Sequence, residues 1–348
     1  MRDEFLRKLD YGAAIATPRM GLSISHVPHE ILAFGPAGVA PGPPLSPRDL
    51  WRVARGSNVG RSIRRFRYSR RAMRIEFTKM HGLGNDFIVF DAASHDPLPT
   101  AEQFRRLAAR NTGIGFDQAL VLEKPKRSGT SAFYRVFNAD GIEVEQCGNG
   151  ARCIAALLHR RGQAPDGEFT MDSPGGLIRA RVENRTVVSV DMGIPNFDPR
   201  SLPFDAAGEA ASYSLNVNGR SIDFGAVSLG NPHAVLTVAS VERAPVEELG
   251  PLIERHARFP NRVNVGFMEI VDRSNIRLRV FERGVGETRA CGTGACGAVA
   301  VGHKHGQLDD DVRVQVRGGE LRVHWPGPGQ HIWLTGPAEI SFEGRVDL

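Results

Sequence analysis

The chain has little of several features that mark specialised classes of protein. Only four of its 348 residues are cysteines, too few for a disulfide scaffold at this length. It has no run of 18 or more apolar residues, so the sequence predicts no transmembrane helix and no membrane partner. Hydrophobic residues make up 41% and charged residues 24%, which is typical of a globular protein with room for two domains or one large one.

The net charge of +5 is distributed unevenly along the chain. Residues 1–72, here called the leader, contain 13 Lys and Arg residues against 5 Asp and Glu residues. Residues 73–348, here called the body, contain 31 against 34. The excess of positive charge therefore belongs to the leader, and the body gives no electrostatic reason to expect a nucleic-acid partner.

The leader lacks the apolar periodicity of a folded domain. The segment 33–47 is rich in Gly, Pro and Ala, and residues 61–71 form a basic run. This composition predicts a disordered extension, or a stretch upstream of a natural start at Met73. Two alternatives remain open. One is an organelle-targeting peptide, against which the five acidic residues count. The other is an RNA- or anion-binding arm centred on the basic run.

An internal repeat organises the body. Each half contains a Leu-Gly-Asn motif and, about 60 residues later, a Cys-Gly-x-Gly-Ala motif preceded at ten residues by a Phe. An apolar stretch that is predicted to be helical follows each cysteine and ends at a glycine. The paired features are Asn85 and Asn231, Phe137 and Phe281, Cys147 and Cys291, and the helical stretches 151–161 and 295–305.

Between these motifs apolar and polar residues alternate as in strands, and Gly-rich turns separate the alternating segments. The predicted strands are 74–79, 131–137, 177–192, 221–227, 234–238, 276–281, 312–316 and 319–325. We therefore predict an α+β fold of two pseudo-symmetric domains, each a mainly antiparallel sheet with one principal helix. A pseudo-twofold relation allows the two Cys-Gly turns to face a shared cavity, and domain interfaces are common small-molecule sites.

Each Cys-Gly-x-Gly turn places a thiol at the start of a predicted helix. The free backbone N–H groups and the helix dipole there stabilise a thiolate and also bind a carboxylate. Two symmetric thiols suit inversion at a carbon acidified by a carboxylate, because a thiolate removes the proton from one face and a thiol returns one to the other. We therefore predict that Cys147 and Cys291 are an acid/base pair that needs neither a metal nor a pyridoxal cofactor.

Other interpretations of the cysteines explain less. Inert burial is common for cysteine, but it does not account for the repeated turn. Cys153 and Cys296 lie among apolar residues one or two turns into the predicted helices, so we expect them in the core. The spacing of the four cysteines does not match the paired hooks of a zinc site, and no metal is expected. His303 and His305 end a predicted helix and favour contacts with its terminus.

Four long motifs of the body resemble the diaminopimelate epimerase family. They are residues 80–87 (MHGLGNDF), 137–153 (FNADG followed by EQCGNGARC), 230–234 (GNPHA) and 282–296 (ERGVGETRACGTGAC). The resemblance extends from Met73 to the C-terminus. It implies cofactor-independent epimerisation of LL-2,6-diaminopimelate to meso-diaminopimelate in lysine and peptidoglycan precursor biosynthesis. It also implies a cytoplasmic enzyme, often a homodimer, with two barrel-like antiparallel sheets each around a central helix.

The resemblance implies a role for many residues around the two turns. Cys147 and Cys291 match the acid/base pair. The positions that match substrate-binding residues are Asn85, Gln118, Asn138, Gly148, Asn149, Asn231, Asn264, Glu282, Arg283, Gly292 and Thr293. His233 and Glu282 match positions that tune the thiols. Gln118 rests on the resemblance alone, because nothing in its local sequence marks it.

The resemblance also divides the body into an N-terminal domain of residues 73–191 with 337–348 and a C-terminal domain of residues 192–336. Proline racemase-like enzymes of similar fold share two-cysteine chemistry, so racemisation of another amino acid is the alternative function. A non-catalytic binding protein on the same scaffold would not need the two thiols.

Overall fold

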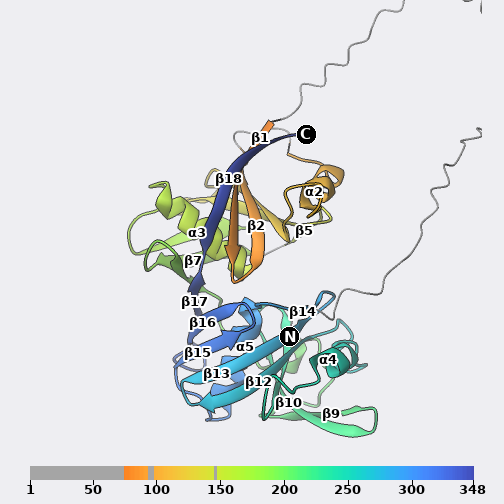
Figure 1. The fold of residues 1–348 in the computed structure, drawn as a ribbon. Coiled ribbons are helices and arrows are strands. Elements are labelled where there is room, and N and C mark those ends of the chain that lie inside the picture. The colour runs from red at the N-terminus through yellow and green to blue at the C-terminus, as the bar shows by residue number, and fades with distance from the viewer. Residues whose placement is uncertain (1–73, 93–97, 145–146) are drawn as a thin grey trace, which may run out of the picture. The chain divides into compact units, whose positions relative to one another are not determined.

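The computed structural model describes residues 74–92, 98–144 and 147–348 (Figure 1). The leader lies outside the described residues, and so do the predictions of disorder, targeting and nucleic-acid binding made for it. In the described part of the chain, no helix is long and apolar enough to cross a membrane.

The first half of the body surrounds helix α3 (Gly148–Arg160) with strands and adds a shorter helix, α2 (Ala101–Ala108). Every α3 residue from Asn149 to Leu158 is buried, as expected for a helix with strands around it. The strands of this half are β1 (Arg74–Gly82), β2 (Asn85–Asp91), β3 (Gln118–Glu123), β4 (Phe133–Asn138), β5 (Glu143–Val144), β6 (Glu168–Ser173), β7 (Gly176–Val182) and β8 (Val187–Asp191).

The second half repeats this plan around α5 (Gly292–Lys304), with α4 (Val246–Glu254) as its shorter helix. Its remaining elements are η3 (Pro199–Ser201), β9 (Tyr213–Val217), β10 (Arg220–Ser228), β11 (Pro232–Thr237), β12 (Asn264–Asp272), β13 (Asn275–Glu282), β14 (Gly286–Thr288), β15 (Asp311–Val316), β16 (Gly319–His324) and β17 (Trp333–Pro337). The last strand, β18 (Glu339–Asp347), pairs antiparallel with β1.

Strand pairing confirms that the halves are related. In the first half β2 and β3 are parallel, β3 and β4 are antiparallel, and β6, β7 and β8 follow as a meander. In the second half β11 and β12 are parallel, β12 and β13 are antiparallel, and β15, β16 and β17 form the matching meander. Antiparallel pairing of β8 with β17 joins the two sets. The predicted α+β fold with two pseudo-repeated halves is therefore confirmed.

The predicted element boundaries differ from the structure in two informative places. Both principal helices begin three residues earlier than predicted, because each cysteine is itself the N-cap and the Gly-x-Gly turn is already helical. The predicted strand 177–192 is two strands, β7 and β8, separated by a turn. The proposed domain boundaries near residues 191 and 336 stay a prediction.

Candidate active site

The two predicted acid/base cysteines occupy equivalent places. Cys147 is the N-cap of α3 and Cys291 is the N-cap of α5, each with an extended backbone conformation. The amide of Gly294 donates to the Cys291 sulfur at 3.4 Å. A Cβ on Gly294 would lie 3.3 Å from that sulfur, so glycine is what lets the helix start pack closely around the thiol.

Both thiols line one cavity of about 960 Å³. Motif residues from both halves of the sequence contribute to it, which is what the internal repeat predicted. Of the predicted site residues, the cavity is lined by Asn85, Gln118, Asn138, Cys147, Gly148, Asn149, Asn231, Glu282, Cys291, Gly292 and Thr293. His233, Asn264 and Arg283 are the three predicted residues that do not line it.

A chain of hydrogen bonds supports Cys291. The Thr293 hydroxyl lies 3.5 Å from the Cys291 sulfur and accepts from Nδ2 of Asn231 at 3.2 Å. Oδ1 of Asn231 contacts Nε2 of His233 at 3.0 Å. Burial lowers the pKa of His233 to about 3, and the positive charge of Arg283 adds to this effect. His233 is therefore neutral near pH 7, and its Nε2–H donates to Asn231 and fixes that amide.

A second chain supports Cys147. Oδ1 of Asn85 lies 4.0 Å from the Cys147 sulfur and accepts from Nδ2 of Asn149 at 3.0 Å. Nδ2 of Asn85 donates to Asp117 at 2.9 Å. Asp117 pairs in turn with Arg110, which also contacts Asp86. The orientation of Asn85 is thus set from both sides.

Burial raises the pKa of both thiols. For Cys147 the negative charge of Glu282 adds to this effect, while the N–H groups of Gly150 and Asn149 and the charge of Arg152 oppose it. For Cys291 burial and Glu282 raise the pKa well above its usual value, against the opposing Thr293 hydroxyl and Gly294 amide. Both thiols are therefore protonated in the free protein near neutral pH.

The pKa of the Glu282 carboxyl group is itself subject to opposing effects. Burial raises the pKa of its carboxyl group, while hydrogen bonds from Thr288 and Cys291 lower it. Its Oε1 accepts from the Thr288 hydroxyl at 2.5 Å. The negative charge of this carboxylate disfavours the thiolate form of both cysteines. A carboxylate beside a thiol is also a group that can accept the proton of that thiol.

The repeat explains why Gln118 belongs to this set. Gln118 is the first residue of β3, and Asn264 is the first residue of the equivalent strand β12. Asn138 ends β4 as Glu282 ends β13. Nε2 of Gln118 donates to Oδ1 of Asn138 at 2.9 Å, so two adjacent strand ends present their amides together. This correspondence could have marked Gln118 from the repeat if strands β3 and β12 had been predicted.

Asn264 and Arg283 stand behind the cavity lining. Asn264 is buried; its Nδ2 donates to the Pro232 carbonyl, and its Oδ1 accepts from the Arg283 amide at 2.9 Å. The Arg283 guanidinium is exposed and donates to the Asn261 carbonyl at 3.2 Å. Asn264 therefore fixes the backbone that carries Arg283 and does not itself reach the cavity.

The sequence interpretation missed several residues that line or organise the cavity. They are Arg110, Asp117, Asp140, Glu287, Thr288 and Arg289. Asp117 is adjacent to Gln118 and Thr288 is three residues before Cys291, but a single polar residue at a strand end carries no distinctive signal. Cys153 and Cys296 are fully buried among apolar side chains, which confirms the expectation that they belong to the core.

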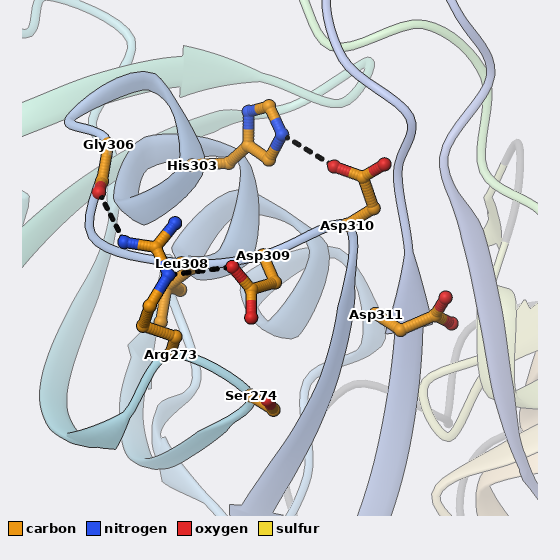
Figure 2. A pocket seen from close by; sticks show the side chains of 8 residues that line it. All are labelled: Arg273, Ser274, His303, Gly306, Leu308, Asp309, Asp310 and Asp311. Atoms are coloured by element: carbon orange, nitrogen blue, oxygen red, sulfur yellow. Dashed lines mark hydrogen bonds and ion pairs between the residues drawn. The ribbon is translucent and has the colours of Figure 1, made fainter.

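A second hollow of about 600 Å³ lies at the C-terminal end of α5, the end opposite Cys291 (Figure 2). His303 contacts Asp310 at 3.0 Å, and Arg273 donates to Asp309 and to the Gly306 carbonyl. Figure 2 shows these polar groups directed at one another. His303 thus contacts Asp310, and His305 contacts the Ala211 carbonyl at 2.7 Å, both outside α5. The predicted interaction of these two histidines with the helix terminus stays a prediction.

Comparison with known proteins gives a consistent result. The family model described as diaminopimelate epimerase matches residues 77–197 and 225–341. A diaminopimelate epimerase from Nitrosomonas europaea is 54% identical over 276 residues, which cover 79% of this chain and 100% of that protein. One from Alkalilimnicola ehrlichii is 51% identical over 278 residues, with the same shares covered.

Solved structures of low sequence identity share the fold. A probable proline racemase from Agrobacterium radiobacter K84 matches with a TM-score of 0.57 and 19% identity, over 79% of this chain and 93% of that one. A PhzF-family phenazine biosynthesis protein from Bacillus anthracis matches with a TM-score of 0.55 and 17% identity, over 78% and 99%. The match of the family model and the identity to curated relatives show that this chain belongs to the diaminopimelate epimerase family, whose members are amino-acid epimerases, a kind of isomerase.

Proposed function

We propose that Cys147 and Cys291 carry out the epimerisation of LL-2,6-diaminopimelate to meso-diaminopimelate by a two-base proton transfer without a cofactor. One cysteine, as thiolate, removes the proton from the α-carbon of the substrate. The other, as thiol, delivers a proton to the opposite face. The thiol and thiolate exchange roles when the reaction runs in reverse, so atoms and charge balance over each turnover.

One observation carries this proposal: two thiols at equivalent helix N-termini line a single cavity. The transition state places negative charge on the α-carboxylate, and the amides of the turns after Cys147 and Cys291 are donors suited to it. Gly148, Asn149, Gly292 and Thr293 form these turns. The positive ends of α3 and α5 add to the same stabilisation.

Substrate binding also accounts for how a thiolate forms. The reacting carbon carries an ammonium group, and its positive charge beside the thiols favours the deprotonated form that burial opposes. Glu282, which is hydrogen-bonded to Cys291, is the group placed to take up the displaced proton. His233 tunes Cys291 indirectly, by holding Asn231 against Thr293.

The second amino-acid centre of diaminopimelate requires further polar groups, and the side chains around the strand ends suit it. Oε1 of Gln118 is buried and has no hydrogen-bond partner in the described part of the chain, so it is available to an ammonium group. Asn85, Asn138 and Asn231 line the same cavity. Arg283 clamps the distal carboxylate after its guanidinium leaves the Asn261 carbonyl, with Asn264 anchoring its backbone.

Activity measurements on single variants test the proposal. Cys147→Ala and Cys291→Ala should each abolish formation of meso-diaminopimelate from the LL isomer, measured by chiral chromatography. Both variants should keep the wild-type circular dichroism spectrum. Cys153→Ala is the matched control, because it removes a thiol from the same helix without touching the cavity. Near-full turnover by either of the first two variants would refute the two-base mechanism. Turnover of proline in place of diaminopimelate would keep the chemistry and overturn the substrate.

Two further proposals concern the setting of the enzyme. We propose a cytoplasmic homodimer, as the family resemblance implies. Light scattering after gel filtration decides the oligomeric state, and a mass equal to one chain would contradict the dimer.

A further inference from the structure

The turn that joins β1 to β2 contains a strained residue. The two strands pair as far as Gly82 opposite Asn85, so Leu83 and Gly84 alone form the turn. Both have a positive φ, 57° for Leu83 and 86° for Gly84, as type I′ hairpin turns require. Asn, Asp or Gly normally occupies the first of these positions, because a larger side chain is strained there. A leucine at that position therefore indicates that its side chain serves another purpose.

The second half of the body contains the group that Leu83 packs against. Gly318, in the turn between β15 and β16, is so close that a Cβ on it would collide with the Leu83 carbonyl oxygen. A Cβ on Gly319 would lie 2.8 Å from Cδ2 of Leu83. The Leu83 side chain is half-buried and also packs against the main apolar core. Gly318 and Gly319 thus form a site that accommodates Leu83 closely, here called the glycine notch.

Leu83 is linked to the first half of the cavity through Asn85, which is two residues later in the chain. Oδ1 of Asn85 lies 4.0 Å from the Cys147 sulfur and accepts from Asn149 at 3.0 Å. Gly84 and Asn85 line the cavity, whereas Leu83 does not. A shift of the turn would therefore move Asn85 within the cavity, although Leu83 itself lies outside it.

The glycine notch is linked in the same way to the second half of the cavity. The Gly318 amide donates to the carbonyl of Arg289 at 2.8 Å, and Arg289 is two residues before Cys291. A Cβ on Gly84 would lie 3.1 Å from Nε of Arg289, so the β1–β2 turn contacts this segment as well. These contacts hold the segment before Asn85 against the segment before Cys291, one from each half.

The internal repeat is not symmetric at this contact. The second Leu-Gly-Asn motif begins at Leu229, which does not have a positive φ. The β6–β7 turn is the equivalent of the β15–β16 turn, and Gly176 begins β7 as Gly319 begins β16. A Cβ on Gly176 would meet no atom of the described residues within 4 Å. A requirement of the fold that both halves share would therefore not explain the contact at Leu83.

We propose that Leu83 is a positioning residue, which packs into the glycine notch and holds the two halves of the cavity in the arrangement that epimerisation requires. The strained turn is kept because the leucine side chain fills the notch. This rests on the proposed acid/base roles of Cys147 and Cys291. It adds to them a residue outside the cavity on which the relative placement of the two thiols depends.

Two substitutions in the full chain disturb this contact in different ways. Gly318→Ala places a Cβ against the Leu83 carbonyl oxygen, a backbone atom that cannot rotate away. Leu83→Ala removes the side chain from the glycine notch. A misplacement of about 1 Å far from the chemistry can cost about a hundredfold in rate, so each variant should lose roughly tenfold to a hundredfold in kcat/KM for LL-diaminopimelate. KM should rise and kcat should fall together, because the arrangement of the halves affects both binding and chemistry.

Alkylation by iodoacetamide separates a displaced contact from an unfolded protein. The reaction of each cysteine is followed by peptide mass spectrometry at one pH. Cys147 and Cys291 line the cavity, whereas Cys153 and Cys296 are fully buried in the core. In both variants the two cavity thiols should react several-fold faster than in the wild type, because the reagent reaches them more easily. The two core thiols should stay unreactive.

Gly208→Ala and Leu83→Met are the matched controls. A Cβ on Gly208 would meet no described atom within 4 Å, so this variant should match the wild type in both measurements. Methionine has nearly the volume of leucine and fills the glycine notch, so Leu83→Met should keep kcat/KM within about threefold of the wild type.

The proposal is overturned if Leu83→Ala keeps the wild-type kcat/KM, or if Leu83→Met falls as far as Leu83→Ala. It is also overturned if Leu83→Ala makes the core thiols reactive, because the contact is then needed only for folding. If Gly318→Ala unfolds the protein, Leu83→Ala decides the question. Failure of the two-base mechanism itself is distinguishable, because it appears as turnover by Cys147→Ala.

Discussion

Replacement of Thr293 by valine removes a hydroxyl group that contacts the Cys291 thiol, one of the two proposed acid/base groups. The Thr293 hydroxyl lies 3.5 Å from the Cys291 sulfur and accepts from Asn231 at 3.2 Å. Valine has nearly the same shape and no hydroxyl, so the substitution removes both interactions without opening a cavity. Cys291 is 5% exposed, so little water is available to replace the lost donor.

The magnitude follows from the charge that the hydroxyl stabilises. A hydrogen bond to a charged group contributes about 1.5–3 kcal/mol. The long distance to sulfur indicates the lower end of that range. We expect a loss of about 1.5 kcal/mol, which is roughly tenfold in kcat/KM and about one unit in the pKa of the Cys291 thiol. The pKa rises, because the hydroxyl favours the thiolate.

The assay compares Thr293→Val with Thr293→Ser, which keeps the hydroxyl and loses only a methyl group. The serine variant should stay within about threefold of the wild type in kcat/KM, and the valine variant should fall roughly tenfold below it. Alkylation of Cys291 should shift to higher pH in the valine variant only, with Cys147 as the internal reference. Equal kcat/KM values for the two variants would refute the reasoning.

We make three further predictions, for Cys153→Ala, for His233→Gln and for deletion of residues 1–72. Cys153→Ala should keep turnover and lose about 1 kcal/mol of unfolding free energy in urea, and a loss of rate in a folded protein would contradict its place in the core. The folded pKa of His233 is about 3, below the unfolded value near 6.5, so protonation of the unfolded chain destabilises the fold as pH falls through this window. Between pH 7 and 5 the wild type should lose about 2 kcal/mol more than His233→Gln, and equal losses would exclude a buried neutral imidazole. Deletion of residues 1–72 should leave turnover unchanged, which a comparison with the full chain can contradict.

The sequence predicted the architecture because the motifs recur. Matched Asn, Phe and Cys positions gave two halves, and the glycines around each cysteine gave the helix starts to within three residues. The shorter helices escaped prediction, because α2 and α4 have only eight and nine residues and depend on packing against strands. Strands β3 and β12 escaped it because their central residues are buried and do not alternate with polar ones.

The sequence predicted the cysteines of the candidate site and their turns, but it missed the residues that orient them, and the reason is physical. Cys147, Cys291 and the adjoining turns stand in distinctive local sequence, and they line the cavity. The groups that orient them do not have such a signal. Asp117 and Arg110 act through Asn85 and Asp86, which are more than 20 residues away in the sequence, and only the fold brings them together. Thr288 reaches Glu282 because strands β13 and β14 pair.

The most direct test of the two-base account is a single time course in heavy water. The reduced protein is incubated with LL-diaminopimelate, and the α-hydrogen content of substrate and product is followed by NMR and mass spectrometry. The account predicts that the first meso product carries deuterium at the inverted carbon while the remaining LL substrate keeps its proton, because different thiols remove and deliver the hydrogen. Meso product that retains the original proton, or LL substrate that exchanges as fast as product forms, would contradict it.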